Sequence, residues 1–181
     1  PVAYLDAFGG YLGRLEPPMP RVAALQRAQL RLAERPDACL ALARTVVVAK
    51  LRGTRANLRR WEGPAHDTLM ARIQHAERHG GDAPNLDVLR GHEGAGAAAY
   101  FEGLALLLPE NWSFRGRRFN PPGDPFNALL SYLYSLLHVR LVGAIAAAGL
   151  NPYLGFFHAD RDGHAALASD LIEEWRPMVD R

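Results

Sequence analysis

The sequence predicts a mainly α-helical, multi-helical domain preceded by a short β-hairpin. Apolar residues recur at helical spacing after residue 21, beginning with Val22, Leu25 and Leu32. Glycine and proline interrupt these helical stretches at intervals, whereas only residues 2–15 resemble paired strands. With 181 residues, the chain is long enough to form one domain with a hydrophobic core.

Residues 2–15 are interpreted as two strands joined around Gly9-Gly10, because adjacent glycines favour a hairpin turn. A lone hairpin is at best marginally stable in water. We therefore expect residues 1–16 to be the end of an N-terminal β-domain. The proline-rich residues 17–20 are predicted to be a stiff linker, and residues 21–181 a helical domain.

Two helices are expected in the first part of the helical domain. The first follows the stripe from Val22 to Leu32. Asp37 is a candidate cap for a longer helix that runs through Leu51. The run at residues 46–48 is three valines, which alone would favour a strand, but its flanks are helical.

Capping residues and prolines mark four further helices. Pro64 is expected to open one that ends near Gly80-Gly81, and Asn85 or Asp87 to start the next, which stops at Pro109. Asp124-Pro125 is a cap followed by a first-turn proline, and the helix it opens should reach Gly149. A last helix should follow Gly163 and end before Pro177.

Composition excludes few functions. The formal net charge is only +2, so overall charge does not indicate a nucleic-acid partner. The apolar run from Leu136 to Leu150 contains His138 and Arg140, which favours a buried helix over a membrane span. A lone cysteine, Cys39, excludes an intrachain disulfide framework and favours a reducing compartment, so we expect a cytoplasmic protein.

Four potential metal ligands lie in three separated, otherwise mainly apolar segments: Glu93, His158, Asp170 and Glu173. Carboxylates with one imidazole suit a hard or borderline divalent cation, which in turn suits chemistry on phosphates. Each residue also has a simpler explanation: Glu93 as an exposed helix residue, His158 as a hydrogen-bonded core residue, and the acids as a solvated face. Asp170 and Glu173 would share one helix face and repel each other unless a cation lies between them.

Arginine supplies all but one of the 21 basic residues, the exception being Lys50. A GC-rich genome explains most of this excess, so position matters more than number. Arg52, Arg55 and Arg59 recur at helical spacing, and an exposed charged face is as good an explanation for them as DNA contact. The sequence from 114 to 119, FRGRRF, places Arg115, Arg117 and Arg118 beside aromatic residues, which favours nucleic-acid binding.

Four ordered motifs resemble the CRISPR-associated adaptation endonuclease family, Cas1. They are GHEG at 91–94 with AAYF at 98–101, NPPGDPFNALLS at 120–131, GLNP at 149–152 leading into GFFH at 155–158, and ALASDLIEEWRP at 166–177. A weaker similarity extends upstream through Gln29 and Lys50. Together the resemblance covers nearly the whole chain.

The resemblance implies a metal-dependent DNA endonuclease and integrase that inserts foreign-DNA spacers into a CRISPR array by phosphodiester transesterification. It implies Glu93, His158 and Glu173 as ligands for Mg²⁺ or Mn²⁺, with Asp170 as a further catalytic, supporting acid. Whether Asp170 or Glu173 is the direct ligand stays open. Asn127 and Ser131 match a motif near the family's active site and are assigned to DNA contact with the six arginines.

The expected partners are spacer-precursor and repeat DNA, a second copy in a homodimer, and the small dimeric Cas2 protein, with no membrane. Family members carry a complete N-terminal β-domain and continue beyond the position of Arg181. We therefore expect a piece of a longer polypeptide, and fusion to another CRISPR-associated domain would be compatible with it. Two alternatives stay open: a non-catalytic DNA-binding module whose acids pair with arginines such as Arg140 or Arg176, and a redox carboxylate metalloprotein. No Glu-x-x-His motif supports the second alternative.

Overall fold

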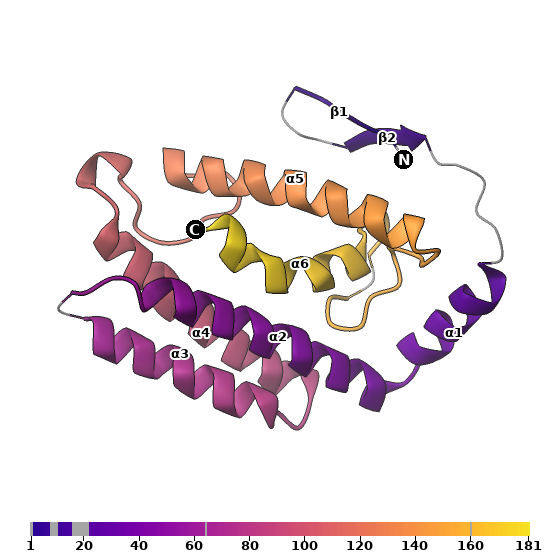
Figure 1. Cartoon of the computed structure of the whole chain (residues 1–181), viewed down its shortest axis with the longest axis horizontal. Coiled ribbons are helices and arrows are strands. Elements are labelled where there is room, and N and C mark those ends of the chain that lie inside the picture. Colours follow the sequence, from indigo (N-terminus) through magenta and orange to yellow (C-terminus); the bar gives the residue numbers. More distant parts are fainter. Residues whose placement is uncertain (1, 8–10, 16–21, 64, 160) are drawn as a thin grey trace. The chain divides into compact units, whose positions relative to one another are not determined.

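A computed structural model describes the chain except for residues 1, 8–10, 16–21, 64 and 160 (Figure 1). The described residues form six α-helices, a short 3₁₀ helix and one two-stranded antiparallel sheet, so the expected mainly helical class with an N-terminal hairpin is confirmed. They divide into two compact units. The first comprises residues 1–43 and 132–172, and the second comprises residues 44–131 and 173–181.

The hairpin belongs to the first unit and pairs β1 (Val2–Leu5) with β2 (Tyr11–Leu15). Its register places Val2 opposite Leu15, with an irregularity after Tyr4. The predicted Gly9-Gly10 turn and the predicted linker at residues 17–20 lie outside the described residues. Helix α1 (Ala23–Ala33) follows the expected apolar stripe.

Helix α2 (Pro36–Leu58) includes the three valines at 46–48, as its flanks predicted. The expectation that Asp37 caps this helix is wrong. The helix begins at Pro36, and Asp37 lies in its first turn. Proline is suited to the first helical position because its missing N–H would have had no partner there. The Asp37 carboxylate instead accepts a hydrogen bond from Arg35 Nη2 at 2.7 Å.

The second unit contains most of α2 together with α3 (His66–Gly81) and α4 (Leu86–Leu107), and the last two are in direct contact (Figure 1). Its core includes Leu51, Ile73 and Leu89, all fully buried. Two α4 glycines allow α2 to approach closely. A methyl group at Gly96 would lie 2.3 Å from Leu51 Cδ2, and one at Gly103 would lie 2.6 Å from Leu58 Cδ1.

Local signals set the ends of α4 and α5. Asn85 caps α4 by accepting a hydrogen bond from Val88 N at 2.9 Å, which decides between the two predicted starts. Asp124 likewise accepts from Asn127 N at 2.8 Å at the start of α5 (Pro125–Ala147). The predicted opening of α3 at Pro64 lies outside the described residues. The 3₁₀ helix η1 (Glu110–Trp112) follows α4.

Helix α5 carries the apolar run that was expected to be buried. Within this run Val142, Ile145 and Ala146 are buried, whereas Ala144 and Ala147 are exposed, so the expectation is confirmed only for one side of the helix. By length and composition alone α5 could cross a membrane, which is weak evidence because core helices meet the same criterion. Its buried side helps to form the core of the first unit, with Val142, Ile145, Ala165, Leu167 and Ala168.

Helix α6 (Ala166–Val179) continues through Pro177, so the expected stop before that proline is wrong. Pro177 lies in the last turn, so the one i→i−4 backbone hydrogen bond lost with its N–H falls near the end of the helix. Its ring occupies the space beside Gly53, 2.8 Å from where a Cβ would stand. Its carbonyl accepts a hydrogen bond from Asn57 Nδ2 at 2.5 Å. These two contacts with α2 hold the helix in its continued form.

Candidate metal centre and nucleic-acid interface

Two of the predicted metal ligands meet at a single buried cation. Lys50 lies on α2, Glu93 on α4 and Glu173 on α6, all within the second unit. The Lys50 ammonium donates hydrogen bonds to Glu93 Oε1 and to Glu173 Oε2. The Lys50 and Glu173 side chains are only 8% and 5% exposed, and Glu93 is 22% exposed. The fold therefore brings two carboxylates from distant segments around one positive charge.

The charge balance of this cluster keeps Lys50 protonated. Burial alone would lower the pKa of Lys50, but the charges of Glu173 and Glu93 outweigh it and raise the pKa above its ordinary value. Arg176 Nη2 approaches the second oxygen of Glu173, Oε1, at 3.3 Å. One alternative from the sequence pairs an acid with Arg176, and Glu173 forms that pair. Glu173 also pairs with Lys50, which the sequence did not predict.

Asp170, the other predicted acid, has a different environment. Its carboxylate is fully buried in the first unit and accepts hydrogen bonds from the backbone N–H groups of Phe156, Phe157 and His158 at 2.6, 3.1 and 2.8 Å. It also lies 2.7 Å from His158 Nδ1. Because a carboxylate accepts, Nδ1 carries the proton, and in the neutral ring Nε2 then has a lone pair for a metal. Asp170 is therefore well placed to orient His158, and its oxygens are already used by the protein.

The loop before His158 is shaped to reach Asp170. A side chain at Gly155 would lie 2.8 Å from both Asp170 Oδ2 and Ala166 Cβ, so only glycine permits this approach. Gln29 of α1 fixes the same loop, donating to the carbonyls of Asn151 and Leu154 at 2.8 and 3.1 Å. Its Oε1 accepts from Asn151 N at 2.8 Å. In the sequence, Gln29 is only part of a weak family resemblance. These contacts show that it anchors the loop before His158 to α1.

The four predicted catalytic residues thus form two groups: Glu93 with Glu173, and His158 with Asp170. Each group lies within one of the two units, and α6 supplies one acid to each. Within the part of the chain that the structure describes, no three side chains of the metal-binding types form a ready-made cluster. The chemistry of the first group nevertheless fits a divalent cation, since its two carboxylates already surround a positive charge.

The first predicted arginine group lies on helix α2 and just past its end. Arg52 Nε donates to Glu77 Oε1 of α3 at 2.8 Å, and Arg55 Nε lies 3.0 Å from Glu77 Oε2. Glu77 is only 11% exposed, and its carboxylate forms ion pairs with both arginines. Arg59 is exposed beyond the end of the helix. The assignment of these residues to DNA contact stays a prediction, but part of their charge is neutralised within the protein.

The second predicted group is organised around Asn127. This fully buried side chain accepts hydrogen bonds from Arg117 Nη1 and from Arg118 N, at 3.0 and 2.8 Å. It donates to the Gly116 carbonyl at 2.9 Å and to Asp124 Oδ2 at 2.6 Å. Arg117 also donates to Ser131 Oγ at 3.1 Å. Asn127 therefore holds the loop in place, and the structure brings it together with Arg117 and Ser131.

The loop leaves cationic and aromatic groups at its surface. Arg115 and Arg118 are exposed, and the Phe119 ring is 74% exposed. The Arg117 guanidinium lies 5.6 Å from the centre of that ring. This combination can supply salt-dependent attraction to phosphates and a face for base stacking.

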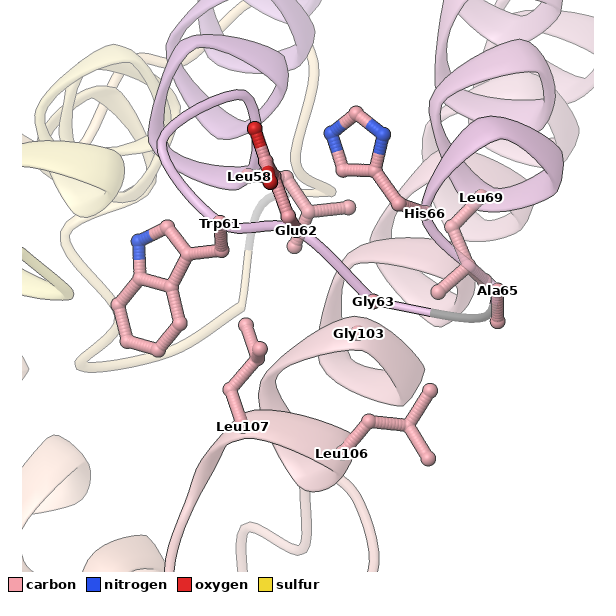
Figure 2. A pocket seen from close by; sticks show the side chains of 10 residues that line it. All are labelled: Leu58, Trp61, Glu62, Gly63, Ala65, His66, Leu69, Gly103, Leu106 and Leu107. Carbon is pink, nitrogen blue, oxygen red and sulfur yellow. The ribbon is translucent and has the colours of Figure 1, made fainter.

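An apolar cavity of about 270 Å³ lies elsewhere in the second unit (Figure 2). Figure 2 shows the Trp61 indole, the His66 imidazole and the side chains of Leu106 and Leu107 around it. His66 Nδ1 contacts Asp67 Oδ1 at 3.0 Å. None of the predicted site residues lines this cavity.

Comparison with known proteins gives a consistent result. The whole chain, residues 1–181, matches the family described as "CRISPR associated protein Cas1". It is 38% identical over 174 residues to the CRISPR-associated endonuclease Cas1 of Mycobacterium tuberculosis (strain CDC 1551 / Oshkosh), covering 95% of this chain and 52% of that protein. It is 37% identical over 191 residues to the CRISPR-associated exonuclease Cas4/endonuclease Cas1 fusion of Geobacter sulfurreducens, covering 99% of this chain and 34% of that protein.

Comparison with solved structures also finds similar proteins. A casposase bound to its integration product superposes with a TM-score of 0.79 at 28% identity, over 98% of this chain and 51% of that one. A chain of a Cas6-RT-Cas1–Cas2 complex gives 0.85 at 29% identity, over 97% of this chain and 20% of that one. This chain thus spans about half the length of the stand-alone Cas1 proteins it matches, such as the one from M. tuberculosis. The motifs, the fold and these similarities lead to one conclusion: the chain belongs to the Cas1 family of CRISPR-associated proteins.

Proposed function

We propose that this chain forms the catalytic part of a metal-dependent DNA endonuclease and integrase that inserts spacers into a CRISPR array. One observation carries the proposal: Glu93 and Glu173, from helices far apart in sequence, both bind the Lys50 ammonium. A fold that gathers two carboxylates around one cation can offer the same oxygens to Mg²⁺ or Mn²⁺. The similarity to a casposase bound to its integration product supports the reaction class.

The protein residues have separate roles in this proposal. Glu93 and Glu173 would supply carboxylate oxygens. We favour Glu173 over Asp170 as the direct acidic ligand because Glu173 already binds a cation, whereas the Asp170 oxygens accept hydrogen bonds from the loop before His158. His158 is the third ligand predicted from the motif, and the Asp170 carboxylate fixes its ring with the proton on Nδ1. A bound divalent ion would act as a Lewis acid that stabilises charge on the phosphate oxygens during exchange.

The reaction needs no protein nucleophile. In integration, a 3′-hydroxyl of the incoming DNA forms a new phosphodiester bond to the repeat strand. The bond to the original 3′-oxygen breaks, and that oxygen leaves as a hydroxyl. In simple cleavage, water replaces the incoming 3′-hydroxyl. Arg115, Arg117 and Arg118 would hold the phosphates, with weaker help from the partly neutralised residues Arg52 and Arg55 and from Arg59.

The partners follow from the same similarities. A Cas1 homologue fused to Cas4 and a solved complex that contains Cas1 and Cas2 support assembly with other adaptation proteins. We propose spacer-precursor and repeat DNA as substrates, a second copy of Cas1 and Cas2 as partners, and the cytoplasm as the site of action.

Strand transfer and cleavage on branched and repeat-containing DNA, with Mn²⁺, Mg²⁺ or chelator, test the proposal. Glu93→Gln and His158→Ala should each lower the rate at least about 100-fold, because each removes a predicted ligand from the reacting centre. DNA binding should be largely retained. Glu174→Gln is the matched control, since Glu174 is the exposed neighbour of Glu173, and it should keep its activity. Full activity in both ligand variants would show that the assigned site is wrong.

A second candidate function is a non-catalytic DNA-binding module of the same adaptation complex. The observation that favours it is the pairing of Glu173 with both Lys50 and Arg176, because protein cations alone can neutralise this acid. The module should bind DNA in a salt-dependent manner with no effect of added metal. A longer polypeptide that includes the segments present in full-length relatives should be assayed in parallel. Activity only in the longer protein would favour catalysis.

A further inference from the structure

Lys50 occupies the position between the two carboxylates that the proposed function gives to a metal. Its ammonium contacts one oxygen of each acid, and the cluster is largely shielded from water. Glu93 and Glu173 lie 43 and 123 positions away from Lys50 in the sequence. The contact is therefore a product of the tertiary fold and not of a local helix pairing.

A divalent ion and the Lys50 ammonium compete for the same oxygens. Two like charges a few ångströms apart repel strongly in a poorly solvated site. Arg176 already holds Oε1, the other oxygen of Glu173, at 3.3 Å and adds to the positive charge. Binding of a divalent ion by this acid pair therefore requires the ammonium to leave at least one of the carboxylates.

The residue type suits such an exchange. A lysine ammonium is a compact point charge on a flexible four-carbon chain, so it can bind two carboxylates at one nitrogen and also withdraw. An arginine fork would bind one carboxylate with two parallel hydrogen bonds and leave less readily. Among 21 basic residues, the sequence uses lysine only at this position.

We propose that Lys50 is a built-in exchangeable cation: it holds Glu93 and Glu173 together in the metal-free protein and is displaced from them when a divalent ion binds. The proposal rests on the proposed function, because it assumes that these two acids bind metal. It gives Lys50 a positioning role before metal binding and makes the affinity for metal depend on the strength of the lysine contact.

The single lysine permits a direct test on the unaltered protein. In an NMR spectrum, protein labelled with ¹⁵N-lysine should give one side-chain ammonium signal. In a longer polypeptide with further lysines, the signal that disappears in a Lys50→Arg variant is the one from Lys50. Addition of Mg²⁺ should move the signal along the same saturation curve that calorimetry gives for Mg²⁺ binding. Glu93→Gln should move both curves to higher Mg²⁺ concentration.

Variants of Lys50 supply the second measurement. Lys50→Met keeps an unbranched side chain only one atom shorter but removes the competing charge, and it should lower the Mg²⁺ dissociation constant by about tenfold or more. Lys50→Arg should raise it, because the guanidinium is harder to displace. The labelled wild-type protein decides the question if Lys50→Met does not fold.

Three outcomes separate the two proposals. The exchange is supported if the lysine signal shifts at the same Mg²⁺ concentrations at which Mg²⁺ binds and if Lys50→Met binds Mg²⁺ more tightly. Binding that depends on Glu93 but leaves the lysine signal unchanged overturns the exchange while the proposed metal site stands. Absence of Glu93-dependent binding overturns the metal site, and the exchange with it.

Discussion

The buried carboxylate of Asp170 binds both the backbone N–H and the ring Nδ1 of His158, at 2.8 and 2.7 Å. One side chain thus fixes the position of the histidine backbone and the orientation of its ring. The ring itself remains 35% exposed, so its other nitrogen can reach a ligand from the surface. This arrangement, in which a carboxylate orients a histidine that binds metal, is common in metal sites.

Asp170→Asn should destabilise the protein by about 3 kcal/mol. The amide keeps the size of the carboxylate but replaces an acceptor oxygen with a donor, which would face backbone N–H groups in a fully buried site. Urea unfolding measures the change. Asp162→Asn, in an exposed turn, is the control and should alter the free energy of unfolding by less than about 0.5 kcal/mol. Equal effects of the two substitutions would contradict the structural role of Asp170.

Two glycines of α4 should respond oppositely to alanine. At Gly96 a methyl group would meet the buried side chain of Leu51 at 2.3 Å, so Gly96→Ala should lower the free energy of unfolding by about 1–3 kcal/mol. At Gly91 nothing lies within 4 Å, so Gly91→Ala should raise it by about 0.5–1 kcal/mol through helix propensity. Chemical denaturation of both variants checks the contrast. Stabilisation by Gly96→Ala would mean that α2 and α4 are not as close as described.

The arginines should contribute unequally to DNA binding. Arg115 is exposed, so Arg115→Ala should weaken binding and reduce the slope of log affinity against log salt by about 1. Arg52→Ala should have a smaller effect, because Glu77 already pairs with this guanidinium at 2.8 Å. Fluorescence anisotropy with a labelled duplex across a salt series measures both. A larger loss for Arg52→Ala would place the DNA on α2 instead of the loop at residues 115–119.

Cys39 should react slowly in the folded protein. Burial raises the pKa of its thiol, and the negative charges of Asp170 and Asp37 raise it further. The thiol also donates to the carbonyls of Ala33 and Leu32, at 3.4 and 3.6 Å. At pH 8 less of it is thiolate than in an unfolded chain, so alkylation by iodoacetamide should be at least about tenfold slower than in urea. The rate in the folded protein should still be rising with pH where that of the unfolded protein has levelled off.

Local sequence signals predicted most of the secondary structure. Apolar spacing located α1, and the capping side chains of Asn85 and Asp124 marked the starts of α4 and α5, because each acts within one helical turn. The two errors concerned helix ends: the start of α2, where Pro36 and not Asp37 begins the helix, and the end of α6, which depends on contacts with a distant segment. Pro177 continues α6 because Gly53 and Asn57 of α2 accommodate it, and these residues are more than 100 positions away.

The sequence by itself determined the family, the helical class and the identity of the candidate ligands, since these depend on residue types in ordered motifs. Only the tertiary structure decided how the acids are used. It paired Glu93 and Glu173 with Lys50 and committed Asp170 to His158 and its loop. Spacing along α6 shows that Asp170 and Glu173 are neighbours. It cannot show which cation or backbone group faces each of them, because those partners come from segments that only folding brings together.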